Sequence, residues 1–588
     1  MTTESKRWEV APRATDEHFE KFPDIPRLIV QILYNRGITV EEEARAFLEA
    51  DPSRLNQYED QMKGIGPAVE RIRQAIDNGE EVVVYGDYDA DGVTSTVLLV
   101  EALSAFGVAV KPYIPDRFEE GYGLNKDAIA DLASQGANLV ITVDCGIRSV
   151  DEVAYGNSLG LDFIITDHHH VPRDQGGQDV VPPAVAVINP KQAACPYPFD
   201  ELAGVGLAFK LVQALQDAQR AEVVDEDAGV AGQSAVSPLE ANLLDLVALG
   251  TVADMAPLMK ENRDLVKAGL EQINHPQRVG LRALIEQSRL KVGSITAGSI
   301  GFMLGPRLNA AGRLTHAQLA YQLLSTDNVA EAIRLSQELD RINAERQAMT
   351  QTLVDRAREK ILADEEPAYL YIIADADFNS GVVGLVASRL TDEFYRPVLV
   401  AEYGPDFTKG SGRSIVEFDI ICALDQCSDL LFKYGGHSAA AGFTLKTENL
   451  EAFELRLKEI AHKQLGHRDL RKRLTIDAEI NLKGVTYELA HAIQQLQPFG
   501  YDNPTPRFIS RDLTVRRQTV VGKEGDHLKL KLHDGKRVWD AIGFWMGRRW
   551  PPERKLDKID AVYTLEFNFW NGQTNLQLSL KDIKLSDK

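Results

Sequence analysis

Short apolar runs alternate with amphipathic stretches between residues 82 and 170. The runs are VVVY (82–85), LVITV (139–143) and DFIIT (162–166). Segments that are apolar at every position are typical of strands buried on both faces of a parallel sheet, and the helical pattern of TSTVLLVEALSAFG after the first run fits a crossover helix. A run near Val185 and an apolar helix from Leu243 extend the pattern. We therefore expect a parallel-sheet α/β domain over residues 61–320.

The pattern changes twice after this domain. Residues 328–363 carry apolar side chains three, four and seven positions apart without Gly or Pro, which predicts a long helix. It is either a surface helix on one domain or, as we prefer, a connecting helix (321–365) between two α/β domains. A smaller α/β domain (366–468) follows, with strands YLYIIA and PVLVA and helices after them. The alternation in HLKLKL and NLQLSL then predicts an all-β barrel over 469–588, and residues 1–60 form a separate N-terminal segment.

Length and composition agree with several globular domains. A chain of 588 residues with 44% hydrophobic and 26% charged residues is too long for one core and apolar enough to fold. No stretch reaches the roughly 18 apolar residues of a membrane span, and the N-terminal stretch is polar, so we expect a cytoplasmic protein with no membrane partner. Four scattered cysteines argue against a disulfide framework and against a cysteine-based zinc site.

The net charge of −22 disfavours a nucleic-acid partner at first sight. Residues 506–588, however, contain 17 Lys and Arg against 11 Asp and Glu, a net charge of +6, and four of the five tryptophans. Basic charge interleaved with aromatic rings is typical of surfaces that bind single-stranded nucleic acid. The alternative is a barrel core with an ordinary charged exterior.

Candidate chemistry begins at the end of the first strand. In VVVYGDYDADGVTS, Asp87, Asp89 and Asp91 stand at alternate positions of a Gly-flanked turn before a helix. Ligands of open parallel sheets bind beyond the carboxyl ends of the strands. Three carboxylates this close repel one another unless a cation lies between them. The alternative is an exposed Asp-rich helix cap.

Two further strand ends carry the same kinds of side chain. LVITV is followed by Asp144, and DFIIT is followed by Asp167, His168, His169 and His170. A lone histidine is usually structural, but a histidine run at the same sheet edge as two acidic strand ends indicates metal ligation. Asp254 in ALGTVADMAPL is a further candidate because it is flanked by apolar residues.

This ligand set suits hard divalent ions. Carboxylates with a few imidazoles and no thiolates favour Mn²⁺ or Mg²⁺, and more than four ligands indicate two ions. Two ions at a sheet edge are suited to phosphoester hydrolysis. The sequence contains no G-x-x-x-x-G-K-[ST] match, so a nucleotide-driven motor has no support.

The ordered series GDYDADG, VDCG, TDHHH and GTVADMAPL resembles the DHH phosphoesterase superfamily. The remaining stretches are similar to its RecJ branch, the single-strand-specific 5′ to 3′ exonucleases, over residues 60–588. They are PDRFEEGYGL, LAGVGLAFK, GPRLNAAGRL, GSGRS, YGGHSAAAG and PFGYDNPTPRF. The resemblance implies a DHH catalytic domain (61–320), a DHHA1 domain (366–468) and a DNA-binding domain of the OB type (469–588).

The resemblance also implies roles for individual residues. The metal ligands would be Asp87, Asp89, Asp91, Asp144, His168, His169 and Asp254. Asp144 would bridge two ions and act in catalysis together with His168 and His169. Residues at the 5′ phosphate or along the DNA would be Arg117, Tyr122, Arg307, Asn309, Arg313, Ser411, Arg413 and His437. The composition of the basic tail, separately from the resemblance, makes Trp539, Trp545 and Trp570 candidates for base stacking. Taken singly, an Arg in a Gly-rich loop is more often an ordinary surface or ion-pair residue, whereas the motifs taken together in their order favour phosphate contacts.

The sequence departs from the family pattern in three places, which together involve four residues. Phe378 and Asn379 stand where the family commonly has Trp-His, and Asn379 cannot titrate. Asp502 replaces a usual glycine. Tyr85 occupies the place of a histidine ligand in some members, so we leave it out of the ligand set.

The sequence thus predicts a metal-dependent exonuclease that removes 5′-mononucleotides from the 5′ end of single-stranded DNA in repair and recombination. We expect a monomer, with a single-strand-binding protein and a helicase as further partners. Two alternatives stay open: a DHH hydrolase of short oligonucleotides or cyclic dinucleotides, for which the basic tail would be superfluous, and a DNA-binding scaffold that has lost its metals, against which the intact Asp and His clusters speak.

Overall fold

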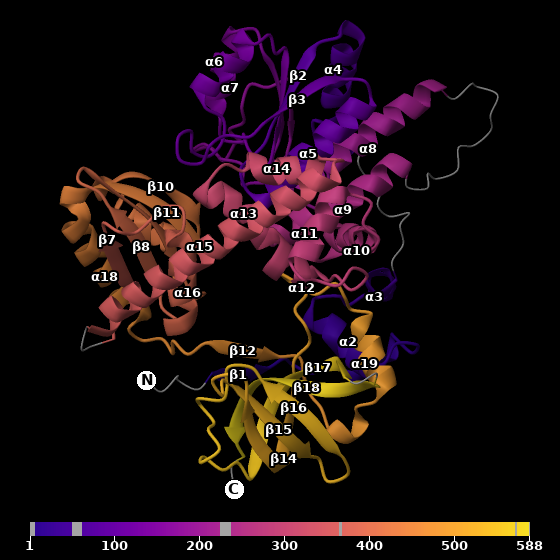
Figure 1. Ribbon diagram of the computed structural model, residues 1–588, viewed down its shortest axis with the longest axis vertical. Helices are drawn as coiled ribbons and strands as arrows, with labels where there is room; N and C mark the ends of the chain where they lie inside the picture. The colour runs from indigo at the N-terminus through magenta and orange to yellow at the C-terminus, as the bar shows by residue number, and fades with distance from the viewer. Residues whose placement is uncertain (1–5, 50–60, 224–236, 364–366, 571–572, 587–588) are drawn as a thin grey trace. The chain divides into compact units, whose positions relative to one another are not determined.

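The computed structural model describes residues 6–49, 61–223, 237–363, 367–570 and 573–586 (Figure 1). The chain divides into two compact units. The larger unit comprises Trp8–Asn309, Ala317–Ser336 and Leu474–Lys588, and the smaller unit comprises Met1–Arg7, Ala310–His316 and Gln337–Arg473. No helix in these described ranges has the length and apolar character required to cross a membrane.

The α/β part of the larger unit contains the predicted parallel sheet. Its strand order is β3-β2-β4-β5-β6, and all neighbours are parallel. The strands are β2 (Glu81–Tyr85), β3 (Ala109–Tyr113), β4 (Leu139–Val143), β5 (Asp162–Thr166) and β6 (Ala186–Ile188). Because β4 and most of β2 and β5 are buried, their apolar runs lack alternation. The run near Val185 forms β6, whereas β3 was not predicted.

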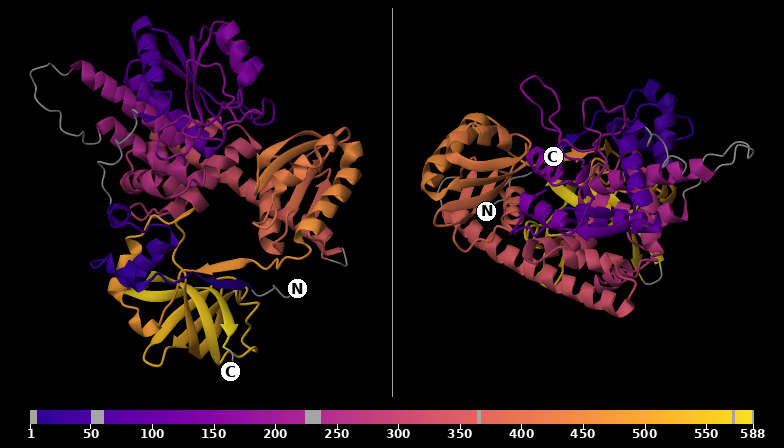
Figure 2. Two further views of the ribbon diagram at one scale, coloured as in Figure 1. Left: turned by 180° about the vertical axis from the view of Figure 1, so that it is seen from behind. Right: turned by 90° about the horizontal axis from the view of Figure 1, so that it is seen from above.

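Helices cover both faces of this sheet (Figures 1 and 2). They are α4 (Ile65–Asn78), α5 (Ala90–Ala105), α6 (Lys126–Ser134), α7 (Val150–Ser158) and α8 (Gly204–Val223). A helical layer continues the unit, and it includes the predicted apolar helix as α9. Its members are α9 (Pro238–Ala253), α10 (Lys260–Asn274), α11 (Val279–Gln287), α12 (Ala297–Ser299), the π-helix η3 (Ile300–Leu304), α13 (Gly305–Leu314) and α14 (Gln318–Ser325).

Helix α15 (Val329–Ala363) runs from the larger unit into the smaller one, which confirms the predicted connecting helix. Its apolar positions Leu335, Leu339 and Ile342 are fully buried. Polar and charged side chains occupy much of the rest of the helix, so the stripe of buried positions explains the periodicity in the sequence.

The smaller unit contains a five-stranded mixed sheet in the order β10-β11-β9-β8-β7. Only β7 and β8 are parallel; the other neighbours are antiparallel. The elements are β7 (Tyr371–Asp375), α16 (Val383–Phe394), β8 (Val398–Tyr403), β9 (Phe407–Arg413), α17 (Ile420–Asp425), η4 (Ser428–Leu430), β10 (Leu431–His437), β11 (Ala440–Lys446), η5 (Thr447–Asn449) and α18 (Leu450–Leu465). The expectation of helices after PVLVA was therefore incomplete, because GSGRS and YGGHSAAAG form strands.

The C-terminal part of the larger unit is a closed barrel, as predicted. Strands β14-β15-β16-β18-β17 follow one another, and β17 pairs back with β14. The elements are β12 (Arg473–Ile476), β13 (Ala478–Glu479), η6 (Leu482–Gly484), α19 (Tyr487–Gln494), β14 (Phe508–Val521), β15 (His527–His533), β16 (Val538–Gly543), β17 (Lys558–Trp570) and β18 (Gln573–Leu585).

The N-terminal segment packs on this barrel. Strand β1 (Arg7–Val10) pairs with β12, and α1 (Asp16–Glu20), α2 (Arg27–Asn35) and α3 (Glu41–Leu48) follow it. Phe19, Phe22 and Ile29 share one hydrophobic core with Leu530 and Trp539 of the barrel. Hydrophobic burial thus joins the two ends of the chain.

Candidate metal centre

The three acidic strand ends meet at one edge of the parallel sheet. Asp87 follows β2, Asp144 follows β4, and His168 and His169 follow β5. Their ligand atoms, with those of Asp89, Asp91 and Asp254, form three groups within 4.8 Å: Asp144 with His168 and His169; Asp91 with His168 and Asp254; and Asp87 with Asp89 and Asp144. The structure therefore brings all seven predicted metal ligands together.

His168 lies at the centre of this cluster. Its Nε2 is 3.1 Å from Asp144 Oδ1, 3.8 Å from Asp254 Oδ2 and 3.9 Å from Asp91 Oδ2. Among the described residues, the buried atoms His168 Nε2, Asp144 Oδ1 and Asp87 Oδ1 have no hydrogen-bond partner. Buried polar atoms without partners are costly, and a divalent cation would satisfy all three. The donor set thus fits a metal centre.

The electrostatics of the cluster agree with this assignment. Burial, followed by repulsion from neighbouring carboxylates, raises the pKa of Asp87, Asp144 and Asp254 well above the ordinary value, and raises that of Asp91 to about 7. Burial also lowers the pKa of His168 to about 3, so its imidazole is neutral and keeps a lone pair for a metal. A cation in the cluster would reverse the carboxylate shifts.

Two of the aspartates also organise helix ends. Asp89 caps α5, because its Oδ1 accepts hydrogen bonds from Asp91 N (2.9 Å) and Gly92 N (3.1 Å). The carboxylate of Asp91 accepts from Gly204 N (2.7 Å) and Val205 N (2.9 Å) at the start of α8. The helix-cap reading of GDYDADG is therefore correct for Asp89 and compatible with the metal cluster.

Gly204 is required by close packing at this point. A Cβ on Gly204 would lie 2.7 Å from Asp144 Cβ and 3.0 Å from Asp91 Oδ2. The start of α8 can therefore approach the two carboxylates only without a side chain. Asp144 itself has a left-handed backbone with φ 61°, which is uncommon outside glycine and recurs at functional sites.

Asp167 has a role that the sequence reasoning missed. Its Oδ1 contacts His169 Nδ1 at 2.7 Å and accepts from His169 N, while Oδ2 accepts from Ile147 N. Burial opposes charge on His169, but the bond to Asp167 and the surrounding carboxylates raise its pKa to about 9. A buried carboxylate that holds one ring nitrogen fixes the orientation of a histidine beside a metal. The signal was the aspartate directly before the histidine pair.

Three aromatic and basic side chains extend from the cluster. Tyr122 Oη lies 3.2 Å from His169 Nδ1 and donates to Asp144 O at 3.3 Å. Its ring contacts that of Tyr88 edge-on, and the guanidinium of Arg117 lies 5.0 Å from the centroid of Tyr88. The structure thus places the predicted Arg117 and Tyr122 beside the metal ligands, with Tyr88 as a linking residue that was not predicted.

Two predicted DNA contacts from GPRLNAAGRL have partners within the larger unit. Asn309 Oδ1 accepts from Ala90 N at 2.8 Å, in the first turn of the helix that carries Asp91. Arg307 donates to Met303 O at 2.7 Å. In this structure Asn309 therefore helps to position α5.

The remaining phosphate candidates gather in the smaller unit. Arg413 on β9 donates to Ser411 Oγ and to Gly412 O, both at 2.8 Å. A Cβ on Gly384, in the first turn of α16, would meet both side chains, at 3.1 Å from Arg413 Nη2 and 3.2 Å from Ser411 Oγ. A guanidinium, a hydroxyl and a helix start in one place are suited to bind phosphate.

His437 and Arg313 belong to the same unit. His437 pairs with Ala440 in the β10–β11 hairpin, and Ala440 pairs with Arg413 of β9, so these residues share one row across three strands. Arg313 donates to Gly381 O, just before α16. Arg313 thus lies beside the start of α16, and Ser411 and Arg413 lie against the first turn of the same helix. His437 lies in the same row of the sheet as Arg413.

The departures from the family pattern have structural explanations. Phe378 is buried in the core beside α16, and Asn379 Oδ1 accepts from Gly381 N at 2.8 Å, which closes a turn. Asp502 has a left-handed backbone with φ 57°, which aspartate tolerates better than most residues. Tyr85 is buried and donates to Gly123 O, so it does not face the metal ligands as a donor.

The three predicted stacking tryptophans differ. Trp545 is 76% exposed and contacts the ring of His527 edge-on, with exposed Phe544 beside it. Trp539 is only 6% exposed and packs in the barrel core, which corrects the prediction that it stacks on bases. The side chain of Trp570 lies outside the described residues.

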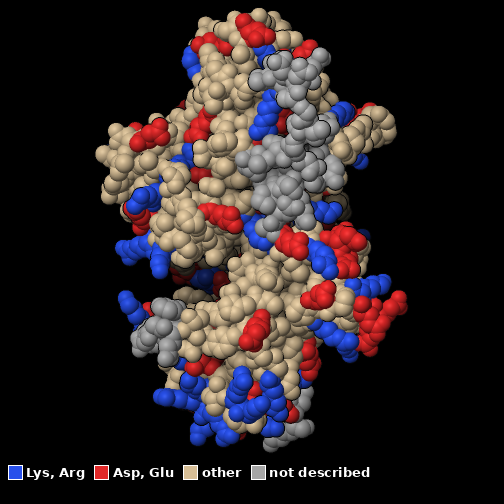
Figure 3. Space-filling view, turned by 90° about the vertical axis from the view of Figure 1, so that its right-hand side faces the viewer, with Lys and Arg blue, Asp and Glu red and all other residues tan. Residues whose placement is uncertain are grey.

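The barrel surface is strongly basic. Lys and Arg gather over it at the bottom of Figure 3. Arg516, Arg517 and Lys529 on β14 and β15 are exposed, and no ion pair of theirs occurs in the described part of the chain. Cations without acidic partners remain available for phosphates.

The sheet edge with its Asp and His ligands defines a protein of the DHH class, and comparison with known families agrees. The model of the DHH family N-terminal domain matches residues 81–251, that of the DHHA1 domain matches 366–463, and that of the RecJ OB domain matches 476–582.

The similarity extends to whole proteins. The chain is 37% identical to the single-stranded-DNA-specific exonuclease RecJ of Bacillus subtilis, over 100% of this chain and 72% of the relative. It is 36% identical to the Salmonella typhimurium protein of the same name, over 97% and 98%. The crystal structure of RecJ from Thermus thermophilus in complex with Mn²⁺ superposes with a TM-score of 0.82 at 29% identity, over 99% of this chain and 80% of that one. The chain belongs to the RecJ family of single-stranded-DNA-specific exonucleases.

Proposed function

We propose that this chain is a metal-dependent exonuclease that hydrolyses single-stranded DNA from the 5′ end and releases 5′-mononucleotides. The observation that carries the proposal is the cluster of five aspartates and two histidines at the sheet edge, with three buried ligand atoms that lack partners. The relatives named above are single-stranded-DNA-specific exonucleases, which supports the substrate class.

Two divalent ions, Mn²⁺ or Mg²⁺, fit the ligand set. Asp87, Asp89 and Asp144 would hold one ion, and Asp91, His168 and Asp254 the other. Asp144 also forms a ligand group with His168 and His169, and its Oδ1 lies 3.1 Å from His168 Nε2, so it would be the carboxylate shared by the two ions. Such ions supply an activated water and stabilise negative charge on the phosphate oxygens.

The chain's own residues prepare this site. The neutral imidazole of His168 offers Nε2 as a ligand, and Asp167 holds Nδ1 of His169. Tyr122 keeps its hydroxyl against His169 and Asp144 O while half of the residue stays exposed, so its ring is available for the terminal base. The side chains therefore orient the terminal nucleotide and limit the freedom of the ligands.

The 5′ preference rests on Arg413 and Ser411. A terminal phosphate carries more charge than an internal diester, and a guanidinium presents a planar fork to it. Arg117 of the larger unit is a further phosphate contact in this proposal, and Arg307, Arg313 and His437 contact the following nucleotides. The basic barrel with exposed Trp545 guides the rest of the strand.

In the cell we place the enzyme in the cytoplasm, as a monomer that acts in DNA repair and recombination. A helicase that unwinds duplex DNA would supply its single strands, and a single-strand-binding protein would be a partner on the same strand. The two partners are predicted because the substrate is single-stranded. The cytoplasmic location and the monomeric state are further predictions.

A substrate panel tests the proposed activity. Labelled single-stranded DNA, blunt duplex DNA and a dinucleotide are incubated with Mn²⁺, Mg²⁺ or a chelator. We expect mononucleotides from the single strand with either ion, little product from the duplex and none with chelator. Preferred cleavage of the dinucleotide would favour a hydrolase of short oligonucleotides, and strand binding without product under all conditions would favour a scaffold.

A further inference from the structure

The first turn of α10 connects several parts of the larger unit. Glu261 pairs with the fully buried Lys210 of α8, and Asn262 Nδ2 donates to Glu201 O before that helix. Arg263, the next residue, bonds to parts of the chain far away in sequence. Three consecutive side chains thus fix α10 to three different neighbours, and α10 begins soon after the metal ligand Asp254.

Arg263 is 1% exposed, and all three nitrogens of its guanidinium group donate to main-chain carbonyls. Nε donates to Phe47 O at 2.9 Å, Nη1 to Leu496 O at 2.9 Å and Nη2 to Gln495 O at 3.1 Å. These carbonyls lie at the ends of α3 and α19, where helix dipoles are negative. The ring of Phe47 stacks on the guanidinium, with Cζ 3.8 Å from its centroid.

Two of the three carbonyls bound by Arg263, those of Gln495 and Leu496, open the loop 495–505 that leads from α19 into the barrel. Leu258 N donates to Tyr501 O at 2.9 Å in the same loop. A Cβ on Gly500 would lie 2.6 Å from Leu258 Cδ1, so the two segments are in close contact. Leu258 is four residues after Asp254, and the loop therefore lies against the segment that carries a metal ligand.

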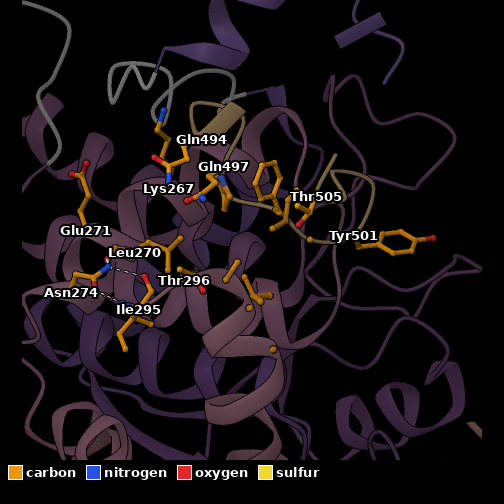
Figure 4. Close-up of a pocket in the computed structure, with 18 of the residues that line it drawn as sticks. Lys267, Leu270, Glu271, Asn274, Ile295, Thr296, Gln494, Gln497, Tyr501 and Thr505 are labelled. Atoms are coloured by element: carbon orange, nitrogen blue, oxygen red, sulfur yellow. Dashed lines mark hydrogen bonds between the residues drawn. The ribbon is translucent and has the colours of Figure 1, made fainter. Parts of the chain in front are cut away.

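A cleft of about 1280 Å³ lies along this contact (Figure 4). Its walls come from residues 252–258, 267–275 and 293–302 of the helical layer and from residues 491–505. Phe302, which is 86% exposed, and Tyr501, which is 57% exposed, belong to its lining. The loop clamped by Arg263 therefore forms one wall of an open cleft beside the metal-ligand segment.

We propose that Arg263 is a positioning residue that holds the barrel and its loop 495–505 against the metal-binding domain, so that a long strand bound by the barrel reaches the metal centre in register. The proposal rests on the proposed function. It predicts an effect that depends on substrate length, because a very short oligonucleotide does not reach the barrel. Arginine is required, since a lysine cannot bond three carbonyls and stack on a ring at once.

A matched buried arginine provides the control. Arg278 donates to Glu101, Asp245 and Leu324 O, and these partners belong to the metal-binding domain and its helical layer. Replacing Arg278 with methionine removes one buried positive charge, as Arg263→Met does, but among the described residues it breaks no hydrogen bond to the barrel or its loop. A purely structural loss should therefore affect short and long substrates to the same extent.

The experiment compares wild type with Arg263→Met, Arg263→Lys, Phe47→Leu and Arg278→Met. kcat and KM are measured with Mn²⁺ on a 5′-phosphorylated trinucleotide and on a 40-nucleotide strand, and melting curves show that each variant is folded. For Arg263→Met we expect at least a tenfold rise in KM for the long strand and less than a twofold change in both constants for the trinucleotide. Arg263→Lys should restore part of the long-strand KM, and Phe47→Leu should raise it by a smaller factor.

Three results would overturn the proposal. They are an unchanged long-strand KM in folded Arg263→Met, an equal loss on both substrates in Arg263→Met and Arg263→Lys, and a length-dependent loss of the same size in Arg278→Met. If wild type cleaves neither substrate, the proposed function fails instead, so the two failures are distinguishable.

Discussion

Replacement of Asp91 by asparagine should change the stability of the metal-free protein in a way that depends on pH. Asp91 is 1% exposed and close to other carboxylates, and burial followed by repulsion from Asp89 raises its pKa to about 7. Its folded-state pKa thus lies above the ordinary 3.8. The stability that belongs to protonated Asp91 is fully present at low pH and is lost as pH rises toward 7.

The size of the effect follows from the two pKa values. Between pH 5 and pH 7 the unfolded chain is ionised at Asp91 while the folded chain is largely protonated, and about 1.4 kcal/mol per pH unit gives on the order of 3 kcal/mol. The asparagine side chain of the variant does not titrate. It loses one acceptor for Gly204 N or Val205 N, which costs about 1–3 kcal/mol at every pH. The free energy of unfolding of wild type, relative to that of the variant, should therefore fall by on the order of 3 kcal/mol from pH 5 to pH 7.

Thermal unfolding of wild type and Asp91→Asn in chelator, at pH 5 and pH 7, measures this change. The difference in Tm should move by roughly 3 °C in favour of the variant at the higher pH, because the unfolding entropy of about 2.1 cal/mol/K per residue is large for a unit of this size. With saturating Mn²⁺ the difference in Tm should instead move in favour of wild type at the higher pH, because the ion binds and stabilises the folded wild type. A difference in chelator that stays constant, or that grows in favour of wild type as pH rises, would refute the reasoning.

Further predictions concern the site and the barrel. Asp144→Asn should lower hydrolysis on the order of 10³-fold, with DNA affinity within about twofold, because ion binding is impaired while the strand is held mainly elsewhere; a wild-type rate would disprove the ligand assignment. Arg413→Ala should reduce the preference for 5′-phosphorylated over 5′-hydroxyl strands by about 1–3 kcal/mol, and Arg413→Lys should restore part of it, as compared by cleavage rates; a full ratio in the alanine variant would mean that Arg413 is structural. Trp545→Ala should weaken binding of long strands by about 1–3 kcal/mol without changing Tm, whereas Trp539→Ala should destabilise the barrel by about 3–5 kcal/mol; titrations and melting curves separate the two.

Three of the strands that the sequence predicted share one property. β2, β4 and β5 lie in the middle of the parallel sheet, so most of their positions are apolar. β3 is an edge strand, and its exposed Lys111 and half-exposed Pro112 removed the signal. The strands β9, β10 and β11 were missed because their Gly, Ser and Ala residues leave only short stretches of recognisable alternation, such as FTLK in β11.

The metal ligands could be predicted because each one follows a recognisable strand or lies in an apolar helix end. Contacts between distant parts of the chain could not. Phe19 and Phe22 share one hydrophobic core with Trp539, which is more than 500 residues away in the chain, and no local pattern indicates it. The bonds from Arg263 to Leu496 O and Phe47 O belong to the same class. Trp539 was wrongly predicted to stack on bases, because composition alone cannot distinguish a ring in the core from an exposed ring.

The direction of hydrolysis is the most direct test of the proposed function. A single strand with a 5′ phosphate is labelled at the 5′ end in one sample and at the 3′ end in another, and products are followed over time with Mn²⁺. We expect the 5′ label to appear at once as a mononucleotide, while the 3′ label stays in strands that shorten gradually, and we expect chelator to stop both changes. Release of the 3′ label first, internal fragments at early times, or cleavage that continues in chelator would contradict it.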